Sequence, residues 1–220
     1  PAPRRGHGFV VERTVYVPRM SDHAFGLAAA FRACGVEAEV LPETDEAAVA
    51  LARRFVSGKE CYPCAVTTGD MLRKAQAPNF DPERSAFFMP SGTGPCRFGQ
   101  YNVLQRQILD QAGFPEVPIF SPVQNERLYQ QLGIVGNDFS RLAWDGVVAF
   151  DLLTKCLHKT RPGETEPGAS DALYARWREE LARAIAGREP DLPGRLGTMR
   201  EEFARVGVNG GERPLIGIVG

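Results

Sequence analysis

Short apolar runs alternate with amphipathic stretches through the first two thirds of the chain. The runs at 14–17 and 37–41 end at Pro18 and Pro42, and two further runs occupy 85–89 and 117–120. The run at 85–89 is apolar at consecutive positions, which is typical of a parallel strand that is covered on both faces. We therefore predict four buried strands.

Helical spacing of apolar positions separates these strands. Ser21 or Asp22 can cap the first helix and Gly35 can end it, while Gly58 ends the second. The strand–helix alternation predicts an α/β fold, a Rossmann-like parallel sheet of about four to five strands with flanking helices. The predicted helices span 21–34, 47–56, 67–75, 100–112 and 127–132.

The remainder of the chain is a C-terminal helical segment. Amphipathic helices are predicted at 139–160, 170–186 and 194–206, and the apolar, β-branched run 215–219 predicts one more strand. A lone strand cannot satisfy its backbone groups. It must add to this sheet, which we favour, pair with a second copy in a homodimer, or be disordered. The predicted organisation is a cysteine-bearing α/β core over 1–138, a helical segment packing on it over 139–213, and a strand at 214–220 that starts or links to a next domain.

Composition narrows the class of protein. The chain is 43% hydrophobic and 24% charged with a formal net charge of -1, so it lacks the basic excess of nucleic-acid-binding proteins. We find neither an apolar run long enough for a membrane span nor a signal peptide, and we expect a cytoplasmic protein. Five cysteines, an odd number, indicate thiols or metal ligands and not a disulfide framework. The absence of an initial Met suggests a piece excised from a longer protein.

Three cysteines stand in two unusual settings. Cys61 and Cys64 form a Cys-Tyr-Pro-Cys pair just before a predicted helix, and Cys96 lies in the Gly/Pro-rich loop 91–99 that follows a predicted strand. Thiolates at this spacing bind soft metals and clusters, and glycines let the backbone approach the sulfurs. Loops after parallel strands meet at one edge of a sheet. We predict that Cys61, Cys64 and Cys96 converge there as metal ligands.

The spacing alone leaves several alternatives open. A closed zinc site needs a fourth ligand, for which Cys156 or His158 would have to reach in. A thioredoxin-like redox pair is less favoured, because a helix and Gly58 precede Cys61 where that fold has a strand. The three cysteines can also be incidental core residues. Cys34 and Cys156, on predicted helices among apolar neighbours, are interpreted as core packing.

The sequence signals for other kinds of functional site are weak. The segment 91–94 could bind phosphate through backbone amides, but it lacks the rest of a nucleotide motif. No Ser-His-Asp arrangement is evident, and His7 and His23 are interpreted as solvent-facing or capping. Three basic side chains can offset the charge of a cluster, and three acidic side chains are isolated signals: Arg19, Lys59 and Arg97, and Glu60, Asp70 and Asp151.

Two blocks of the sequence resemble a known family. Residues 58–64 with Thr68-Gly69-Asp70, and Phe88-Met89-Pro90 with 94–101, are similar to the acyl-CoA dehydratase activase-related proteins. That family is allied to the 2-hydroxyacyl-CoA dehydratase and double-cubane cluster superfamily. The resemblance runs from about residue 15 to residue 220, and its specific part is the two cysteine blocks.

The resemblance implies Rossmann-like domains that hold an iron–sulfur cluster, 4Fe-4S or larger, through Cys61, Cys64 and Cys96. Such a cluster is oxygen-sensitive and can be lost in aerobic preparation. It also implies an ATP-hydrolysing activator domain or protein that delivers low-potential electrons, and a downstream domain of the same full-length chain. The leading hypothesis is thus a cluster-binding domain of a dehydratase-like electron-transfer system that acts on small or acyl-CoA-type substrates. The alternative is a zinc-binding or metal-free structural or interaction module of a larger protein.

Overall fold

A parallel sheet lies at the centre of the molecule. The computed structural model describes residues 12–210 and 216–217, and in these residues four strands pair in the order β2-β1-β3-β5, each pair parallel. The predicted Rossmann-like α/β class is confirmed. The strands are β1 (Thr14–Val17), β2 (Ala38–Val40), β3 (Ser85–Phe88) and β5 (Ile119–Phe120).

The central strands are buried on both faces because their side chains alternate between two hydrophobic clusters. Phe88 packs edge-on against Phe31, with ring centroids 5.6 Å apart, in the cluster on one face. Its neighbour Phe87 belongs with Met71 and Leu72 to the cluster on the opposite face. Successive residues of a strand point to opposite faces, so a run without polar positions needs cover on both.

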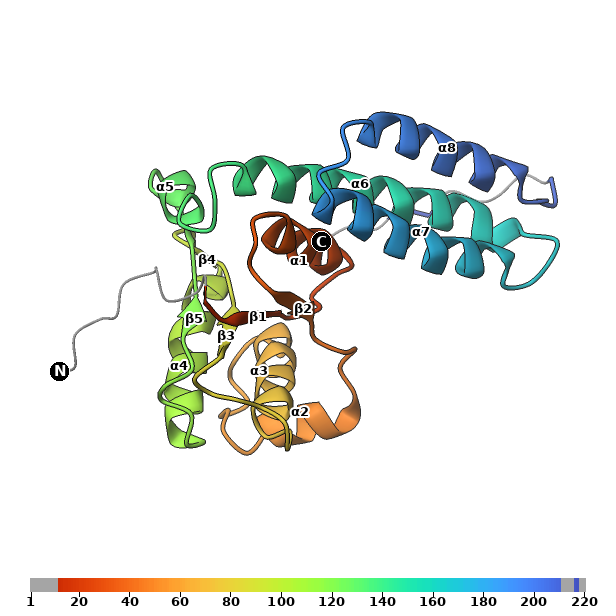
Figure 1. The fold of residues 1–220 in the computed structure, drawn as a ribbon. Coiled ribbons are helices and arrows are strands. Elements are labelled where there is room, and N and C mark those ends of the chain that lie inside the picture. The colour runs from red at the N-terminus through yellow and green to blue at the C-terminus, as the bar shows by residue number, and fades with distance from the viewer. Residues whose placement is uncertain (1–11, 211–215, 218–220) are drawn as a thin grey trace.

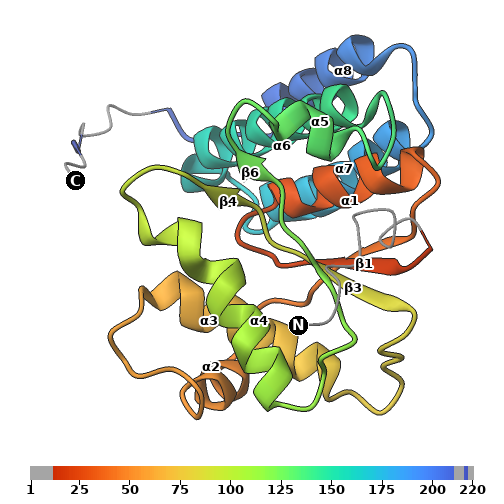
Figure 2. The ribbon, with the colours of Figure 1, turned by 90° about the vertical axis from the view of Figure 1, so that its left-hand side faces the viewer.

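Helices supply this cover in two layers (Figures 1 and 2). The chain leaves β1 toward β2 on one side and then returns past β1 to form β3 on the other. Right-handed crossovers in opposite directions place their helices on opposite faces. The strand order therefore reverses between β1 and β3, which is where open α/β sheets place ligands. One face carries α1 (His23–Ala33) and α6 (Phe139–Thr160), and the other carries α2 (Glu46–Ala52), α3 (Tyr62–Ala75) and α4 (Tyr101–Gln111).

A small second sheet extends beyond the carboxyl edge of β3 and β5. In it β4 (Ser91–Gly92) pairs in parallel with β6 (Val123–Gln124), and the short helix α5 (Leu128–Leu132) follows. The Ser91 backbone N–H donates to the Pro122 carbonyl at 2.9 Å. The weak alternative of a phosphate site on the amides of 91–94 loses its first amide, because strand pairing uses the Ser91 N–H.

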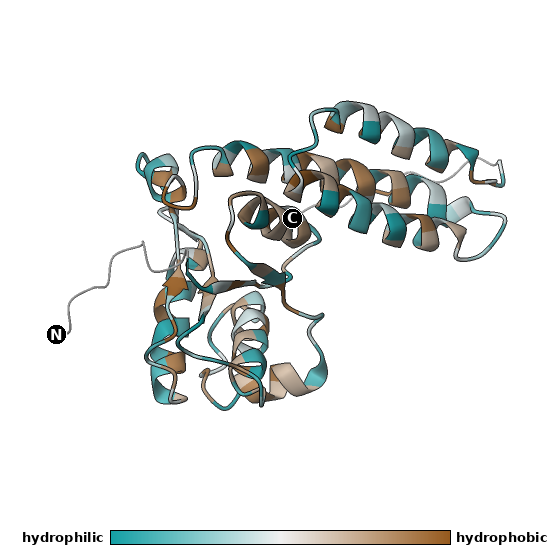
Figure 3. Ribbon diagram, in the orientation of Figure 1, coloured by the Kyte–Doolittle hydropathy of each residue, from teal (hydrophilic) through white to brown (hydrophobic). Residues whose placement is uncertain are grey.

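The C-terminal helices pack on α6 and α1. Buried Trp177, Leu181 and Phe203 meet Phe150 and its neighbours in a third hydrophobic cluster. Figure 3 shows hydrophobic residues gathered in the middle of the molecule, while α7 and α8 carry polar residues on their outer faces. Among the described residues no helix has the length and apolarity of a bilayer span. The further elements are the 3-10 turn η3 (Arg161–Gly163), α7 (Ala169–Ala186) and α8 (Leu192–Arg205).

The predicted terminal strand is not formed where it can be checked. Ile216 and Gly217 have no regular secondary structure, and Ile216 is 81% exposed. The other residues of that prediction, and His7, lie outside the described residues.

Two glycines set the distance between α1 and α6. A Cβ atom placed on Gly26 or on Gly146 would lie 2.9 Å from the backbone of the other glycine. Real Cβ atoms do not approach backbone that closely, so the crossing is possible only because both positions lack side chains. This contact joins the helical segment to the layer that covers the sheet.

Gly146→Ala is therefore expected to lower the free energy of unfolding by about 1–3 kcal/mol, because the two helix backbones must separate. Gly197→Ala in α8 is the matched control, since no atom lies within 4 Å of its added Cβ. That control should leave stability unchanged or raise it by up to about 1 kcal/mol, through helix propensity. Urea unfolding followed by circular dichroism measures both. Equal effects at the two positions would contradict the close crossing.

Candidate functional site

The first cysteine pair begins helix α3. Cys61 is its N-cap residue and Cys64 lies in its first turn, so the helix starts at Tyr62 and not at 67 as predicted. Pro63 favours this start, because a first-turn N–H has no helical partner and proline lacks only that group. Crossover helices run antiparallel to their strands, which puts this N-terminus at the carboxyl edge of the sheet. Cys61 is partly exposed, whereas Cys64 is only 2% exposed.

Cys96 comes to the same edge from the other side. It is exposed and precedes the 3-10 turn η2 (Arg97–Gln100), which leads into α4. The loop folds back on β4: the Ser91 hydroxyl donates to the Gly99 carbonyl at 3.0 Å. A Cβ on Gly99 would overlap the Gly92 carbonyl oxygen, so this turn requires glycine.

A hydrogen bond ties the two cysteine segments together. Arg97 Nη1 donates to the Lys59 carbonyl at 2.8 Å. The segment before Cys61 is ordered by Glu60, whose carboxylate accepts from the Ser57 N–H and hydroxyl and from the Gly58 N–H. Hydrogen bonds from its own backbone N–H, then from the Ser57 hydroxyl, lower the pKa of Glu60. Arg97 thus acts here as a connector of backbone segments.

The Tyr101 hydroxyl lies against the Cys61 sulfur, and the thiols of Cys64 and Cys96 act on it electrostatically. The side chain is 7% exposed and its ring packs edge-on against Phe98 at 5.3 Å between centroids. Burial first, then a hydrogen-bonding contact with the Cys61 sulfur and the charges of Cys61, Cys64 and Cys96, together raise the pKa of Tyr101 to about 12. Cys61 therefore contacts this phenol, in the same region where the Arg97–Lys59 hydrogen bond joins the two cysteine segments.

Polar groups without partners lie beneath the thiols, between α3 and α4. The Thr68 hydroxyl approaches the Cys64 sulfur without full hydrogen-bond geometry and has no other partner. Gln105 donates to the Thr67 hydroxyl at 3.0 Å, but its own Oε1 is unpaired, as is Oδ1 of Asn102. Burial raises the pKa of Cys64, and the Thr68 hydroxyl opposes that effect more weakly. Unpaired buried polar atoms are costly, and they mark this interface as built for more than packing.

The residues of the neighbouring Thr68-Gly69-Asp70 motif have different structural roles. Gly69 lets α3 approach the α2 backbone, since a Cβ there would overlap the Ala48 carbonyl oxygen. Asp70 is 1% exposed, accepts from the Thr44 hydroxyl at 2.6 Å and pairs with Arg73 at 3.3 Å. Burial raises the pKa of Asp70, which Thr44 and Arg73 oppose. Asp70 thus fastens the loop after β2 to α3 and is not an isolated acid.

The residues considered for a fourth ligand are elsewhere. Cys156 packs with the third hydrophobic cluster and His158 lies further along α6, on the opposite face of the sheet from the thiols. Cys34 packs against the cluster of α1 and α6, so both it and Cys156 are core cysteines as predicted. Within the described residues no three His, Cys, Asp or Glu side chains are close enough to hold a single metal ion.

A serine, a histidine and an aspartate do come together away from the cysteines. Ser21 Oγ lies 2.8 Å from His23 Nδ1, and His23 Nε2 lies 2.8 Å from Asp151 Oδ1. The ring is reversed relative to a serine-hydrolase triad, in which the serine contacts Nε2. We interpret this chain as a tie between the start of α1 and α6, and His23 as a bridging residue and not merely a solvent-facing one.

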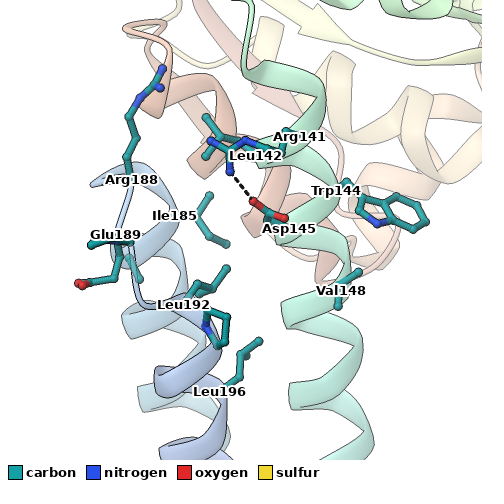
Figure 4. A pocket seen from close by; sticks show the side chains of 13 residues that line it. Arg141, Leu142, Trp144, Asp145, Val148, Ile185, Arg188, Glu189, Leu192 and Leu196 are labelled. Atoms are coloured by element: carbon teal, nitrogen blue, oxygen red, sulfur yellow. Dashed lines mark hydrogen bonds and ion pairs between the residues drawn. The ribbon is translucent and has the colours of Figure 1, made fainter.

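A groove on the α6 side of the molecule lies away from the thiols. It encloses about 530 Å³ between α6 and the turn from α7 to α8. Figure 4 shows Ile185, Leu192 and Leu196 on one side and Val148 on the other, with Trp144 beside it. Trp144 is 67% exposed. Apolar side chains line the groove together with charged ones, of which Arg141 pairs with Asp145 and Arg188 with Asp138; this mixture suits packing against another surface.

Comparison with protein-family models, with curated proteins and with solved structures gives no match for this chain. Function must therefore be argued from the site itself.

The position of Tyr101 yields a titration test. Its folded-state pKa of about 12 lies above the ordinary value of 10.0, so the neutral phenol stabilises the fold below pH 10 and that stability is lost as pH rises through 12. The difference in phenolate absorbance between the wild type and Tyr101→Phe isolates this group. Cys61→Ala should lower its midpoint toward 10, because contact and charge are removed while burial remains. Cys34→Ala should not move it, and a midpoint insensitive to Cys61 would place the sulfur elsewhere.

Proposed function

We propose that Cys61, Cys64 and Cys96 are thiolate ligands of an iron–sulfur cluster, 4Fe-4S or larger. The observation that carries this proposal is that the two cysteine segments are neighbours: Arg97, next to Cys96, donates to the carbonyl of Lys59, two residues before Cys61, at 2.8 Å. They lie at the carboxyl edge of the sheet, where α/β proteins hold ligands.

The donor set suits a cluster better than a single ion. A tetrahedral zinc ion with Zn–S bonds of about 2.3 Å needs sulfurs about 3.8 Å apart. It also needs a fourth ligand, and Cys156 and His158, the two residues considered for that place, lie on the opposite face of the sheet, whereas an iron–sulfur cluster is held by thiolates alone. The buried Thr68 hydroxyl beside Cys64 is a donor that a thiolate or sulfide would satisfy.

When bound, such a cluster supplies low-potential electrons and an iron position open to substrate. The chain supplies the surroundings. Cys64 and Tyr101 lie in the apolar cluster on this face of the sheet and exclude water from one side. Cys96 is exposed, so the other side faces solvent. Arg97 holds the two ligand segments in one arrangement through the Lys59 carbonyl.

The wider system follows from the motif resemblance. We propose that the domain works in a dehydratase-like, ATP-driven electron-transfer system on small or acyl-CoA-type substrates. Its partners would be an ATP-hydrolysing activator and a downstream domain of the same full-length chain. The support for these partners is the pair of cysteine blocks, 58–64 and 94–101.

The proposal of an interaction module remains as a second function, favoured by one observation. The groove beside Trp144 and Val148, which are 67% and 45% exposed, offers an apolar surface for another domain. It lies apart from the thiols, so the two functions are compatible.

Anaerobic reconstitution with iron and sulfide tests the cluster. The wild-type chain should take up both elements and develop the broad visible absorption of an iron–sulfur protein. Cys61→Ser, Cys64→Ser and Cys96→Ser should each reduce the retained iron severalfold, because a thiolate ligand is lost. Cys34→Ser is the matched control and should retain iron, since Cys34 packs on the other face.

An iron-free wild-type protein under these conditions, with Cys61→Ser indistinguishable from it, would end the cluster proposal. Stoichiometric zinc after aerobic purification, lost on the same substitutions, would replace it with the zinc alternative.

The Cys96 loop provides a subtler test. Gly99→Ala should weaken iron retention severalfold, because the added Cβ pushes the turn away from the Gly92 carbonyl and displaces Cys96. Gly94→Ala lies in the same loop with open space around its Cβ and should retain iron at the wild-type level. Iron analysis after desalting compares the two. Equal retention would mean that the loop position does not matter to the site.

A further inference from the structure

Cys61 and Cys64 have the arrangement of a dithiol that can close on itself. Cys61 is the N-cap of α3 and Cys64 is the third residue of the helix, and the Cys64 N–H donates to the Cys61 carbonyl at 2.9 Å. An N-cap side chain normally reaches back to the second or third helical position. The Cα atoms of residues three apart in a helical turn are about 5 Å apart, which lies within the Cα separation of about 4.4–6.8 Å that a disulfide spans.

The two thiols differ in access. Cys61 is partly exposed, so a small reagent can reach its sulfur, which makes no capping hydrogen bond and contacts the Tyr101 hydroxyl. Cys64 is 2% exposed and can be reached from within the protein but not by a bulky reagent. Pro63 between them fixes the turn and lowers the conformational cost of closure. The positive end of the helix dipole favours the negative charge that passes between sulfurs in an exchange reaction.

The surroundings of Cys64 also favour a reactive dithiol. The Thr68 hydroxyl is 1% exposed, approaches the Cys64 sulfur and has no other partner. A hydroxyl so placed can donate to the sulfur when it carries negative charge. The reservation drawn from the sequence, that a redox pair should follow a strand, therefore loses its force: what the pair needs is the start of a helix, and it has one.

We propose that, without metal, Cys61 and Cys64 act as a thiol–disulfide exchange pair toward low-molecular-weight disulfides. The Cys61 thiolate attacks one sulfur of the disulfide and forms a mixed disulfide, and one thiolate of the reagent leaves. Cys64 then attacks the Cys61 sulfur, closing the Cys61–Cys64 disulfide and releasing the second thiolate. The two protons of the protein thiols end on the two released thiols. The protein pair is oxidised and the reagent disulfide is reduced.

This reaction would also control whether Cys61 and Cys64 can bind a metal. A sulfur held in a disulfide is no longer a thiolate, and only the thiolate binds metal. Oxidation of the pair would then block loading of any soft metal at Cys61 and Cys64, and reduction would restore it.

Metal-free protein incubated with glutathione disulfide tests the proposal. Alkylation of the remaining thiols and peptide mass spectrometry should find the Cys61–Cys64 disulfide in the wild type and in Cys96→Ser. Cys64→Ala should stop at a mixed disulfide on Cys61. Cys61→Ala should slow the reaction on the order of tenfold or more, because the accessible sulfur of the pair is gone. Circular dichroism of each variant, with Cys34→Ser as a control, checks that the fold is kept.

A Cys61–Cys96 disulfide in the wild type, a mixed disulfide that persists there, or equal reactivity of Cys61→Ala would each overturn the proposal. The experiment contains no iron, so its result is independent of the cluster. Conversely, failure to reconstitute a cluster would leave the exchange reaction standing.

Discussion

The parallel pairing of β1 with both β2 and β3 is the constraint on which the rest of the molecule depends. Each parallel connection must cross over the sheet, and the two crossovers run in opposite directions from β1. Helices must then cover both faces, which explains strands without polar positions. All crossover helices also begin at the carboxyl edge. The start of α3 and the start of α4 are therefore neighbours there, and so are Cys61 and the turn that follows Cys96.

That arrangement lowers the stability of the fold, because it buries polar atoms that lack hydrogen-bond partners. The facing sides of α3 and α4 bury Thr68 and Gln105 with atoms that lack partners, directly below the thiols. Leucines at these positions would pack without such a penalty. Hydrogen-bonding groups at a helix interface are retained where orientation matters more than stability, as around a reactive sulfur or a ligand. The apolar cluster around Met71 and Ile108 offsets the cost one turn deeper.

The sequence was sufficient for the elements that periodicity controls. The strands around Val15, Ala38, Phe87 and Ile119 form as predicted, and 139–160 is a single helix. The sequence was insufficient where contacts of a few atoms determine the local structure. Pro63 is typical of a loop, but at the second position of a helix proline is tolerated because the N–H that it lacks would have no helical partner there. The pairing of β4 with β6 involves two residues in each strand, too short for any pattern.

The site was predictable in part for the same reason. Strand–loop topology brings Cys61, Cys64 and Cys96 to one edge, which the sequence indicates. The role of Tyr101 was not foreseen, although it ends the motif at 94–101; only the direction of its side chain reveals that it lies against the sulfurs. His158 was weighed as a ligand on residue type alone, and its place on α6 removes it from the thiols.

The helix α6 decides how the molecule can move. Its 22 residues extend about 33 Å at the usual rise per residue. Phe139 and Leu142 at its start belong to the cluster against the sheet, whereas Leu153 and Leu157 near its end belong to the cluster of α7 and α8. A swing of the helical segment over the sheet would have to bend this continuous helix, and its single glycine, Gly146, is pressed against α1. The segment therefore turns with the sheet as one rigid body and cannot act as a lid that swings over the cysteines.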